Sequence, residues 1–278
     1  MKPRATRKGA IVSILALALV ASCGGGRDRT PIEDQSAEQI YQNAEYQLEV
    51  NRADDAAQLF SEIERLYPYS ALAKRALIMQ AYAWHQDKKY EETRAAAQRY
   101  LEFYPADEDA AYAQYLLALS YYDQIDEVGR DQGLTFQALQ ALRVVIETYP
   151  DSQYADSAIL KFDLAFNHLA AKEMEIGRYY HRRKHYTASI SRFRAVVEQF
   201  QTTTHAPEAL YRLVEAYVAL GLYSEAQTAG AILGYNYQST EWYDDAYTLL
   251  TGKGLRLELA GDNWLAQIYR QMVRGEWL

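Results

Sequence analysis

The chain of 278 residues is poor in residues that cross-link or bend a backbone, with one cysteine, six prolines and 14 glycines. A single cysteine excludes an intramolecular disulfide, so packing alone must hold the fold together. An apolar run near the start, residues 10–21, is broken only by Ser13. As a helix it would rise about 18 Å. Because the hydrocarbon core of a bilayer is ~30 Å thick, the run is too short for a permanent membrane span.

Basic residues stand in front of this apolar run, namely Lys2, Arg4, Arg7 and Lys8. A basic start followed by a short apolar stretch is typical of a secretory signal peptide, which is removed from the mature protein. The sequence therefore predicts a signal peptide over residues 1–22, directly before the only cysteine.

That cysteine stands in the sequence Val20-Ala21-Ser22-Cys23, which resembles the lipobox of bacterial lipoproteins. The alternative is an ordinary cleavage site beside a coincidental cysteine. The resemblance implies a diacylglycerol on the sulfur of Cys23 and an N-acyl chain on its amino group, and more than one chain gives stable anchoring. Gly24 follows, which in that resemblance implies passage to the outer membrane. We expect a periplasmic protein held at the membrane by its lipid alone, through a flexible tether over residues 23–36.

The charge balance is acidic, with 29 basic and 37 acidic residues and a formal net charge of −8. The signal peptide takes four basic and no acidic residues, so its removal leaves 25 against 37, a net charge of −12. Because the phosphate backbone repels such a surface, nucleic acid is not expected as a partner.

Tyrosine–proline pairs recur along the chain, and each closes a helical pattern because proline cannot continue a helix. The first two prolines, Pro68 and Pro105, are 37 residues apart, and Pro150 follows after 45. Superposed on the 34-residue tetratricopeptide pattern, the chain divides into five units. These units start near Ala37, Lys74, Ala111, Ala170 and Pro207.

Three positions of the repeat keep their character through the five units. Where the first helix must approach its neighbour closely, the residues are Ala44, Ala81, Ala118, Gly177 and Val214. Where the second helix opens, they are Ala56, Thr93, Ala138, Ser189 and Ala226. Seven residues further on, they are Ile63, Tyr100, Val145, Val196 and Leu233. Small residues let two helices of a hairpin come together, and large apolar residues fill the groove between hairpins.

The predicted fold is all-α, a tetratricopeptide-repeat superhelix of about five helical hairpins; a generic helical bundle is the alternative. Between the third and fourth units lie 22 extra residues. They predict an added long helix, because no glycine or proline interrupts residues 154–176. We expect units one to three over residues 37–150, then the long helix, units four and five and a capping helix over 151–250. Residues 251–278 form a C-terminal tail.

The sequence contains no glycine-rich phosphate loop and no G-x-S-x-G elbow. His181 and His185 have the spacing of two metal ligands on a helix, but the basic residues 182–184 between them repel a cation. We therefore expect no enzymatic activity, no metal and no cofactor apart from the covalent lipid.

Tyrosine is abundant, with 25 in the chain, and it is a rigid amphipathic residue enriched at interfaces. Several tyrosines fall on the face of the first helices that lines the inner groove of such a superhelix. The predicted substrate-peptide groove consists of Tyr41, Arg75, Ile78, Tyr82, Tyr115 and Tyr122. An apolar groove with one cation suits an extended peptide that ends in an aromatic residue and a carboxylate. The alternative is that these residues merely fill the core.

A basic cluster over residues 178–184 stands out in this acidic chain. Arg192 follows on the next helix, directly before the apolar Phe193, so it turns off the buried face and has no packing role there. We expect a docking patch for an acidic partner, formed by Tyr179, Arg182, Arg183 and Arg192, because arginine binds carboxylates in bidentate geometry. The alternative is a solvated helix end whose charges complement the macrodipole.

These features together resemble the BamD family, the lipoproteins of the outer-membrane β-barrel assembly machine. The resemblance rests on the lipobox, the five units and the stretch Arg65-Leu66-Tyr67-Pro68-Tyr69-Ser70. Most specific are Ser152-Gln153-Tyr154-Ala155 before the long helix and Tyr179-Tyr180-His181-Arg182-Arg183 after it. The resemblance implies that the N-terminal units receive unfolded outer-membrane proteins through a C-terminal signal. It also implies docking of the C-terminal units on the periplasmic POTRA region of a BamA-like barrel subunit, with small accessory lipoproteins attached.

The alternative function is a periplasmic adaptor that coordinates envelope or cell-division machinery, like the repeat partner of the Tol system. Such adaptors carry an N-terminal coiled coil, whereas a short glycine-rich segment precedes residue 37 here. A lytic transglycosylase would need a catalytic domain, and the residues after 250 are too few for one. A DNA-uptake lipoprotein is disfavoured by the acidic charge.

Overall fold

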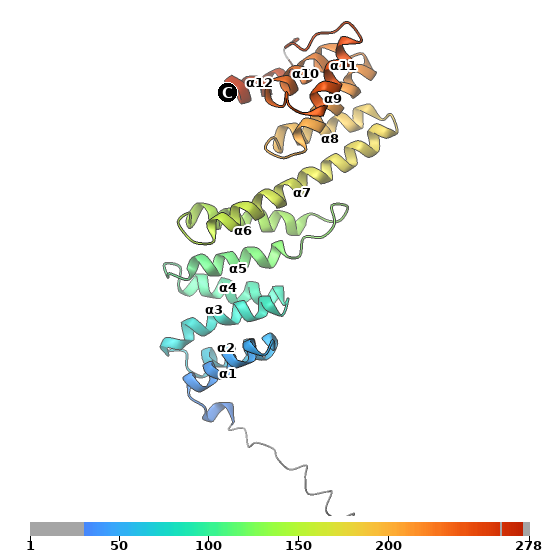
Figure 1. The fold of residues 1–278 in the computed structure, drawn as a ribbon. Coiled ribbons are helices and arrows are strands. Elements are labelled where there is room, and N and C mark those ends of the chain that lie inside the picture. Colours follow the sequence, from blue (N-terminus) through green and yellow to red (C-terminus); the bar gives the residue numbers. More distant parts are fainter. Residues whose placement is uncertain (1–30, 262, 275–278) are drawn as a thin grey trace, which may run out of the picture.

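The computed structural model describes residues 31–261 and 263–274, and the regular elements in these ranges are all helices (Figure 1). Five antiparallel hairpins follow one another and stack side by side. They are α1 (Ala37–Glu49) with α2 (Ala53–Leu66), α3 (Ala71–Gln86) with α4 (Tyr90–Phe103), α5 (Ala110–Tyr122) with α6 (Gly133–Thr148), α7 (Ala155–Arg182) with α8 (Tyr186–Gln199), and α9 (Ala206–Leu220) with α10 (Tyr223–Asn236). Helices α11 (Glu241–Thr251) and α12 (Trp264–Arg274) complete the C-terminal end. The predicted signal peptide and Cys23 lie outside the described residues.

All three repeat positions are buried in every unit, which confirms the predicted all-α repeat fold. The residues that open the second helices and the large apolar residues seven positions later are fully buried throughout. In the first helices, the small or β-branched residues of the close-approach position are buried as well. Residue size at these positions therefore sets how closely neighbouring helices pack.

The tether was predicted to reach residue 36, but its last part is folded. A short 3₁₀ helix, η1 (Ile32–Asp34), precedes α1, and the side chain of Ile32 packs against the first core cluster. The hydroxyl of Tyr67 donates a hydrogen bond to the carbonyl of Gln35. Ser36 then caps α1 in a capping box with Gln39. The fold therefore begins at residue 31 or before, and the predicted boundary is wrong by several residues.

Helix α7 is the long helix predicted between units three and four, and it continues without a break into the first helix of unit four. Figure 1 shows it crossing obliquely between the stack α1–α6 and the group α8–α12. Its first turns place Ala158 in a core cluster with α5 and α6, whereas Leu169 and Met174 belong to the C-terminal cluster. One helix therefore belongs to the hydrophobic cores on both sides of it.

The C-terminal tail is part of the folded core rather than a loose appendage. In α12, Leu265 is fully buried and Ile268 is 7% exposed. The indole nitrogen of Trp264 donates to the hydroxyl of Tyr217 over 3.1 Å. Within the described ranges, none of the helices combines the length and the apolar character that crossing a membrane requires.

Gly177 in α7 allows the closest contact in the fourth hairpin. A β-carbon at this position would lie 2.5 Å from Cε1 of Phe193, whose ring is fully buried in α8. We expect Gly177→Val to lower the free energy of unfolding by about 3 kcal/mol, the upper end of the range for overpacking, because three carbons are added.

Urea unfolding followed by circular dichroism would measure this loss. Gly129→Val is the matched control, because a β-carbon at Gly129 would meet no atom within 4 Å. Equal stability of the two variants would contradict the close contact between α7 and α8.

Candidate functional site

A row of stacked tyrosines links α5 to the start of α7, and we call it the aromatic face. The ring of Tyr154 lies 5.1 Å from that of Tyr112 and 5.2 Å from that of Tyr115, both in stacked geometry. The hydroxyl of Tyr115 shares a hydrogen bond of 2.7 Å with that of Ser157. Burial raises the pKa of Tyr112 well above its ordinary value. The Tyr112 ring therefore stays neutral, and the stacked rings form a rigid, partly accessible surface.

Of the predicted groove residues, Tyr82, Tyr115 and Tyr122 are half-buried and share this side of the N-terminal hairpins. Tyr41 and Ile78 do not line an accessible groove, and including them was wrong. Ile78 is 4% exposed within the core of α3 to α5, and Tyr41 is 6% exposed with its ring 5.2 Å from that of Phe60. The helices here are rich in alanine and pack closely, so Tyr41 and Ile78 are buried between them.

Arg75 is exposed and holds its guanidinium 5.6 Å from the centre of the Tyr41 ring. Neighbouring cations are each bound to a carboxylate, in the pairs Lys74–Asp107, Lys89–Asp54 and Arg99–Glu64. Arg75 has no carboxylate within ion-pair distance in the described part of the chain. It is therefore available for an anionic ligand on α3.

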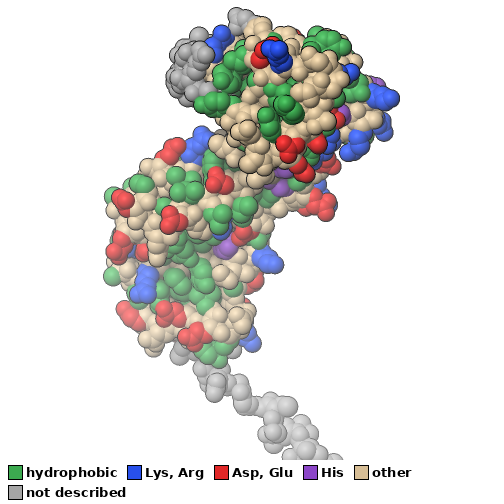
Figure 2. Space-filling view, turned by 45° about the horizontal axis from the view of Figure 1, so that its top comes forward, with side chains coloured by type: hydrophobic (Ala, Val, Ile, Leu, Met, Phe, Trp, Pro, Cys, Tyr) green, Lys and Arg blue, Asp and Glu red, His purple; other side chains and the backbone are tan. Residues whose placement is uncertain are grey.

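A second surface lies at the turn between α7 and α8, where Figure 2 shows basic side chains gathered. Tyr179 is 43% exposed, and the guanidinium of Arg183 lies 4.3 Å from the centre of its ring. Arg182 is exposed beside them. The stacked arginine keeps its hydrogen-bond donors free at the edge of the ring, as interface arginines commonly do.

Arg192 lies on α8 and has an internal role that the sequence did not reveal. Its guanidinium binds the carboxylate of Glu173 on α7 at 3.0 Å. The expectation that Arg192 has no packing role was therefore wrong, because it ties the two helices of the hairpin together. Its side chain remains 45% exposed and borders a surface cleft of about 390 Å³.

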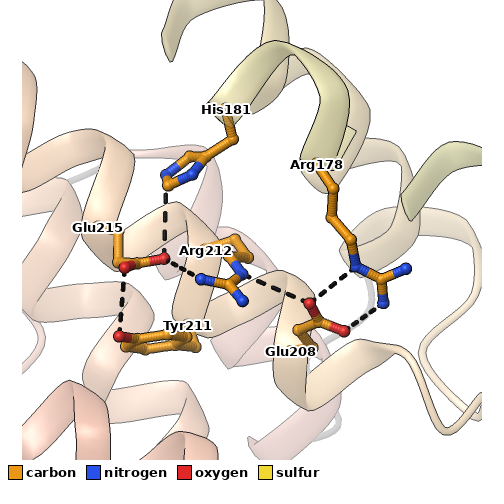
Figure 3. A network of polar contacts seen from close by, with 6 residues as sticks. All are labelled: Arg178, His181, Glu208, Tyr211, Arg212 and Glu215. Carbon is orange, nitrogen blue, oxygen red and sulfur yellow. Dashed lines mark hydrogen bonds and ion pairs between the residues drawn. The ribbon is translucent and has the colours of Figure 1, made fainter. Parts of the chain in front are cut away.

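The basic cluster of residues 178–184 is not one surface, because Arg178 turns inward to α9 (Figure 3). There it forms a bidentate ion pair with Glu208, which is only 9% exposed. Arg212 bridges Glu208 and Glu215, at 3.4 and 2.7 Å. Sequence reasoning missed this network, because its link between the two hairpins joins Arg178 and Glu208, which are 30 residues apart.

The remaining members of the network adjoin Glu215. The hydroxyl of Tyr211 donates to Glu215 over 3.2 Å, and burial raises the pKa of Tyr211 to about 12, so the donor proton is retained. Burial lowers the pKa of His181, which leaves its ring neutral at neutral pH. Its Nε2 atom lies 3.9 Å from Glu215 and has no hydrogen-bond partner within the described residues.

The network predicts a pH-dependent contribution of Glu208 to stability. Burial raises the pKa of Glu208, but the hydrogen bonds and charges of Arg178 and Arg212 outweigh burial and hold it below the ordinary value of 4.5. The carboxylate therefore stabilises the fold above about pH 4.5, and this stabilisation is lost as the pH falls through the lowered pKa. We expect Glu208→Gln to cost about 3 kcal/mol at neutral pH, with the difference from the parent shrinking in acid.

Chemical unfolding of both proteins across this pH range would test the prediction. Glu198→Gln is the control, because the Glu198–Arg194 pair is exposed and a surface pair contributes at most about 1 kcal/mol. A loss in Glu208→Gln no larger than in this control would show that the network does not support the fold.

Neither surface contains a constellation for catalysis. In the described residues, no three histidine, cysteine, aspartate or glutamate side chains come together as a metal site. What the described residues present instead is the aromatic face, Arg75 without a carboxylate partner on α3, and an arginine–tyrosine surface at the turn between α7 and α8. Stacked helical hairpins of this kind define a tetratricopeptide-type scaffold.

The family model YfiO, described as an outer membrane lipoprotein, matches residues 33–232. The chain belongs to this family. A relative from Caulobacter vibrioides, named outer membrane protein assembly factor BamD, is 44% identical over 248 residues, which cover 88% of this chain and 81% of the relative. The protein of the same name from Rickettsia prowazekii is 39% identical, covering 86% and 95%. Helices α11 and α12 lie beyond the residues that the family model matches.

The protein of that name from Neisseria meningitidis serogroup A is 27% identical, covering 84% of this chain and 92% of the relative. Among solved structures, a thermophilic tetratricopeptide protein from Thermus thermophilus aligns with a TM-score of 0.36 and 15% identity, covering 78% of this chain and all of that protein.

Proposed function

We propose that this protein is a scaffold of the outer-membrane β-barrel assembly complex, with no enzymatic activity of its own. The observation that carries the proposal is its membership of a family whose relatives, at up to 44% identity, are named outer membrane protein assembly factors. In this proposal Cys23 bears the diacylglycerol and N-acyl chains. They hold the protein on the periplasmic face of the outer membrane, and the lipid is its only membrane contact.

The N-terminal hairpins receive unfolded outer-membrane proteins in this proposal. The aromatic face offers ring surfaces that bind apolar side chains with little loss of conformational entropy. Arg75 on α3 lacks an ion pair in the described residues, and a peptide ending in an aromatic residue carries a terminal carboxylate to match. Tyr82, Tyr115 and Tyr122 remain the proposed contact residues, together with Tyr112 and Tyr154.

Peptide binding tests this assignment. A fluorescent peptide that ends in a free aromatic residue should bind the soluble mature protein. Tyr82→Ala should weaken binding by more than about 1 kcal/mol, the threshold for an interface residue that matters. Arg75→Ala should remove the preference for the free carboxylate over the same peptide with an amidated terminus.

Fluorescence anisotropy provides the dissociation constants, and Tyr69→Ala serves as the control because Tyr69 is fully exposed on a hairpin turn. Unchanged binding by both Tyr82→Ala and Arg75→Ala would move the substrate site elsewhere.

The C-terminal hairpins dock on the POTRA region of a BamA-like barrel subunit in this proposal. Tyr179, Arg182, Arg183 and Arg192 are the proposed contacts. Arg192 shares its charge with Glu173 yet keeps nearly half of its side chain exposed, so one guanidinium edge can bind a partner carboxylate. Because the ion pair orients the guanidinium in advance, docking loses little side-chain entropy.

The ion pair between Arg192 and Glu173 allows docking to be separated from folding. Arg192→Glu should abolish capture of the partner's periplasmic domains, since like charges meet at the interface. The double variant Glu173→Arg with Arg192→Glu restores the pair inside the hairpin with its charges exchanged. It should recover stability but not docking, because the positive charge has moved to α7.

Pull-down of the soluble mature protein, combined with thermal unfolding of each variant, measures both effects. Docking restored by the exchange would mean that Arg192 acts through the fold alone. Normal docking by Arg192→Glu, with loss in Arg75→Glu, would mean that the two halves have been assigned the wrong way round.

A further inference from the structure

Lys161 is a cation that the structure places directly against the tyrosines of the aromatic face. Its ammonium lies 5.6 Å from the centre of the Tyr122 ring and donates to the hydroxyl oxygen of Ser157 over 3.4 Å. The same oxygen shares the hydrogen bond of 2.7 Å with Tyr115, whose ring stacks on that of Tyr154. Contacts from α5 and from α7 itself therefore hold the ammonium at the edge of the aromatic face.

This ammonium has no carboxylate within ion-pair distance in the part of the chain that the structure describes. Asp156 and Asp163 are on the same helix, but positions five before and two after Lys161 point roughly 140° or more away from it. Asp123, at the end of α5, is bound to His85 at 2.9 Å. Of the three donors of Lys161, one contacts Ser157, and the others are left for a ligand.

The two ends of the aromatic face differ in charge. Asp109 directly precedes α5, and its charge acts on Tyr112 and Tyr154. Lys161 lies at the other end, beside Tyr122, which follows Tyr112 on α5 by ten residues or about 15 Å. An acidic side chain of a bound segment is therefore attracted toward Lys161 and repelled from the Asp109 end.

The position of Lys161 relative to Tyr154 indicates the spacing that such a segment needs. Tyr154 directly precedes α7, and Lys161 follows seven residues later on the same side, two turns and roughly 10.5 Å along the helix. An extended segment advances about 3.3 Å per residue, so about three residues separate a side chain over the Tyr154 ring from one that reaches Lys161. The ring suits an aromatic side chain and the ammonium suits a carboxylate.

We propose that Lys161 determines which segments of unfolded outer-membrane proteins the aromatic face accepts. It selects segments in which an acidic side chain stands about three residues from an aromatic one. The inference rests on the substrate role proposed for the N-terminal hairpins and deepens it. Arg75 on α3 is the proposed contact for a terminal carboxylate, whereas Lys161 recognises a carboxylate within the segment.

Paired peptides test this role of Lys161. Each probe is a fluorescein-labelled peptide that ends in a free aromatic residue and carries a second aromatic residue, with a single aspartate placed at increasing distances from the second one. The same peptide with asparagine keeps the shape and removes the charge. At a spacing of about three residues, the aspartate peptide should bind the soluble mature protein about fivefold more tightly than the asparagine peptide. In Lys161→Met the two peptides should bind equally.

Lys253→Met is the matched control, because Lys253 is exposed just after α11, outside the aromatic face. It should keep the ratio of the two affinities found in the parent, and Arg75→Ala should weaken both peptides without changing that ratio. Thermal unfolding of every variant verifies that it is folded. Equal affinity of the two peptides at every spacing, or a preference for aspartate that persists in Lys161→Met, would overturn the proposal.

The same peptides separate this inference from the proposed function. If the asparagine peptide binds and Tyr82→Ala weakens it, but aspartate is preferred at no spacing, the substrate site is correct and the role of Lys161 is wrong. If the preference for aspartate depends on Lys161 while Tyr82→Ala and Arg75→Ala bind normally, Lys161 keeps its role and the proposed contacts on α3 are wrong. If neither peptide binds the parent, the substrate site is wrong and the inference falls with it.

Discussion

The packing of α7 against the hairpins on its two sides is the constraint on which the rest of the structure depends. Its 28 residues extend about 42 Å as one hydrogen-bonded helix. Ala158 completes the core formed with α5 and α6, and Met174 completes the core formed with α8 and α9. Gly177 lets the ring of Phe193 approach, and Arg178 binds Glu208 on α9. Because these contacts act on one continuous helix, the aromatic face and the basic turn keep a defined relative position.

Charge pairing inside the protein determines which cations can act outside it. The acidic excess provides a carboxylate for many basic side chains, so an arginine in the sequence can be a structural residue rather than a ligand for a partner. Arg178 is paired with Glu208 in this way, and Arg192 is paired with Glu173 but remains partly exposed. Arg75, Lys172 and Arg183 bind instead to a ring or to a backbone carbonyl. Neither a ring nor a carbonyl neutralises a positive charge, so these positions can attract acidic partners.

Some tyrosines of this protein fill the core and others form part of its surface, and their burial distinguishes the two roles. Tyr100 is fully buried and fills one of the repeat positions, whereas Tyr112, Tyr115 and Tyr154 stack with their edges toward the surface. Tyr217 has a structural role at the C-terminal end, where its hydroxyl accepts a hydrogen bond from Trp264 of α12. Helices α11 and α12 thus cover apolar surface that the last repeat would otherwise expose, as terminal repeats require.

The sequence by itself determined the repeat fold and the long helix. Residue size recurring at helical spacing specifies which positions face the core, and this depends only on neighbours along the chain. The sequence also predicted that Arg183 lies at the surface, where the structure has it exposed. Only the tertiary structure decided that Tyr41 and Ile78 are buried, that Arg178 and Arg192 bind carboxylates, and that Lys161 lies against the ring of Tyr122. Those outcomes depend on how closely two helices approach when the contacting residues are far apart in the sequence, as in the pairs Arg192–Glu173 and Arg178–Glu208. The distance between two such helices is set by all the side chains packed between them.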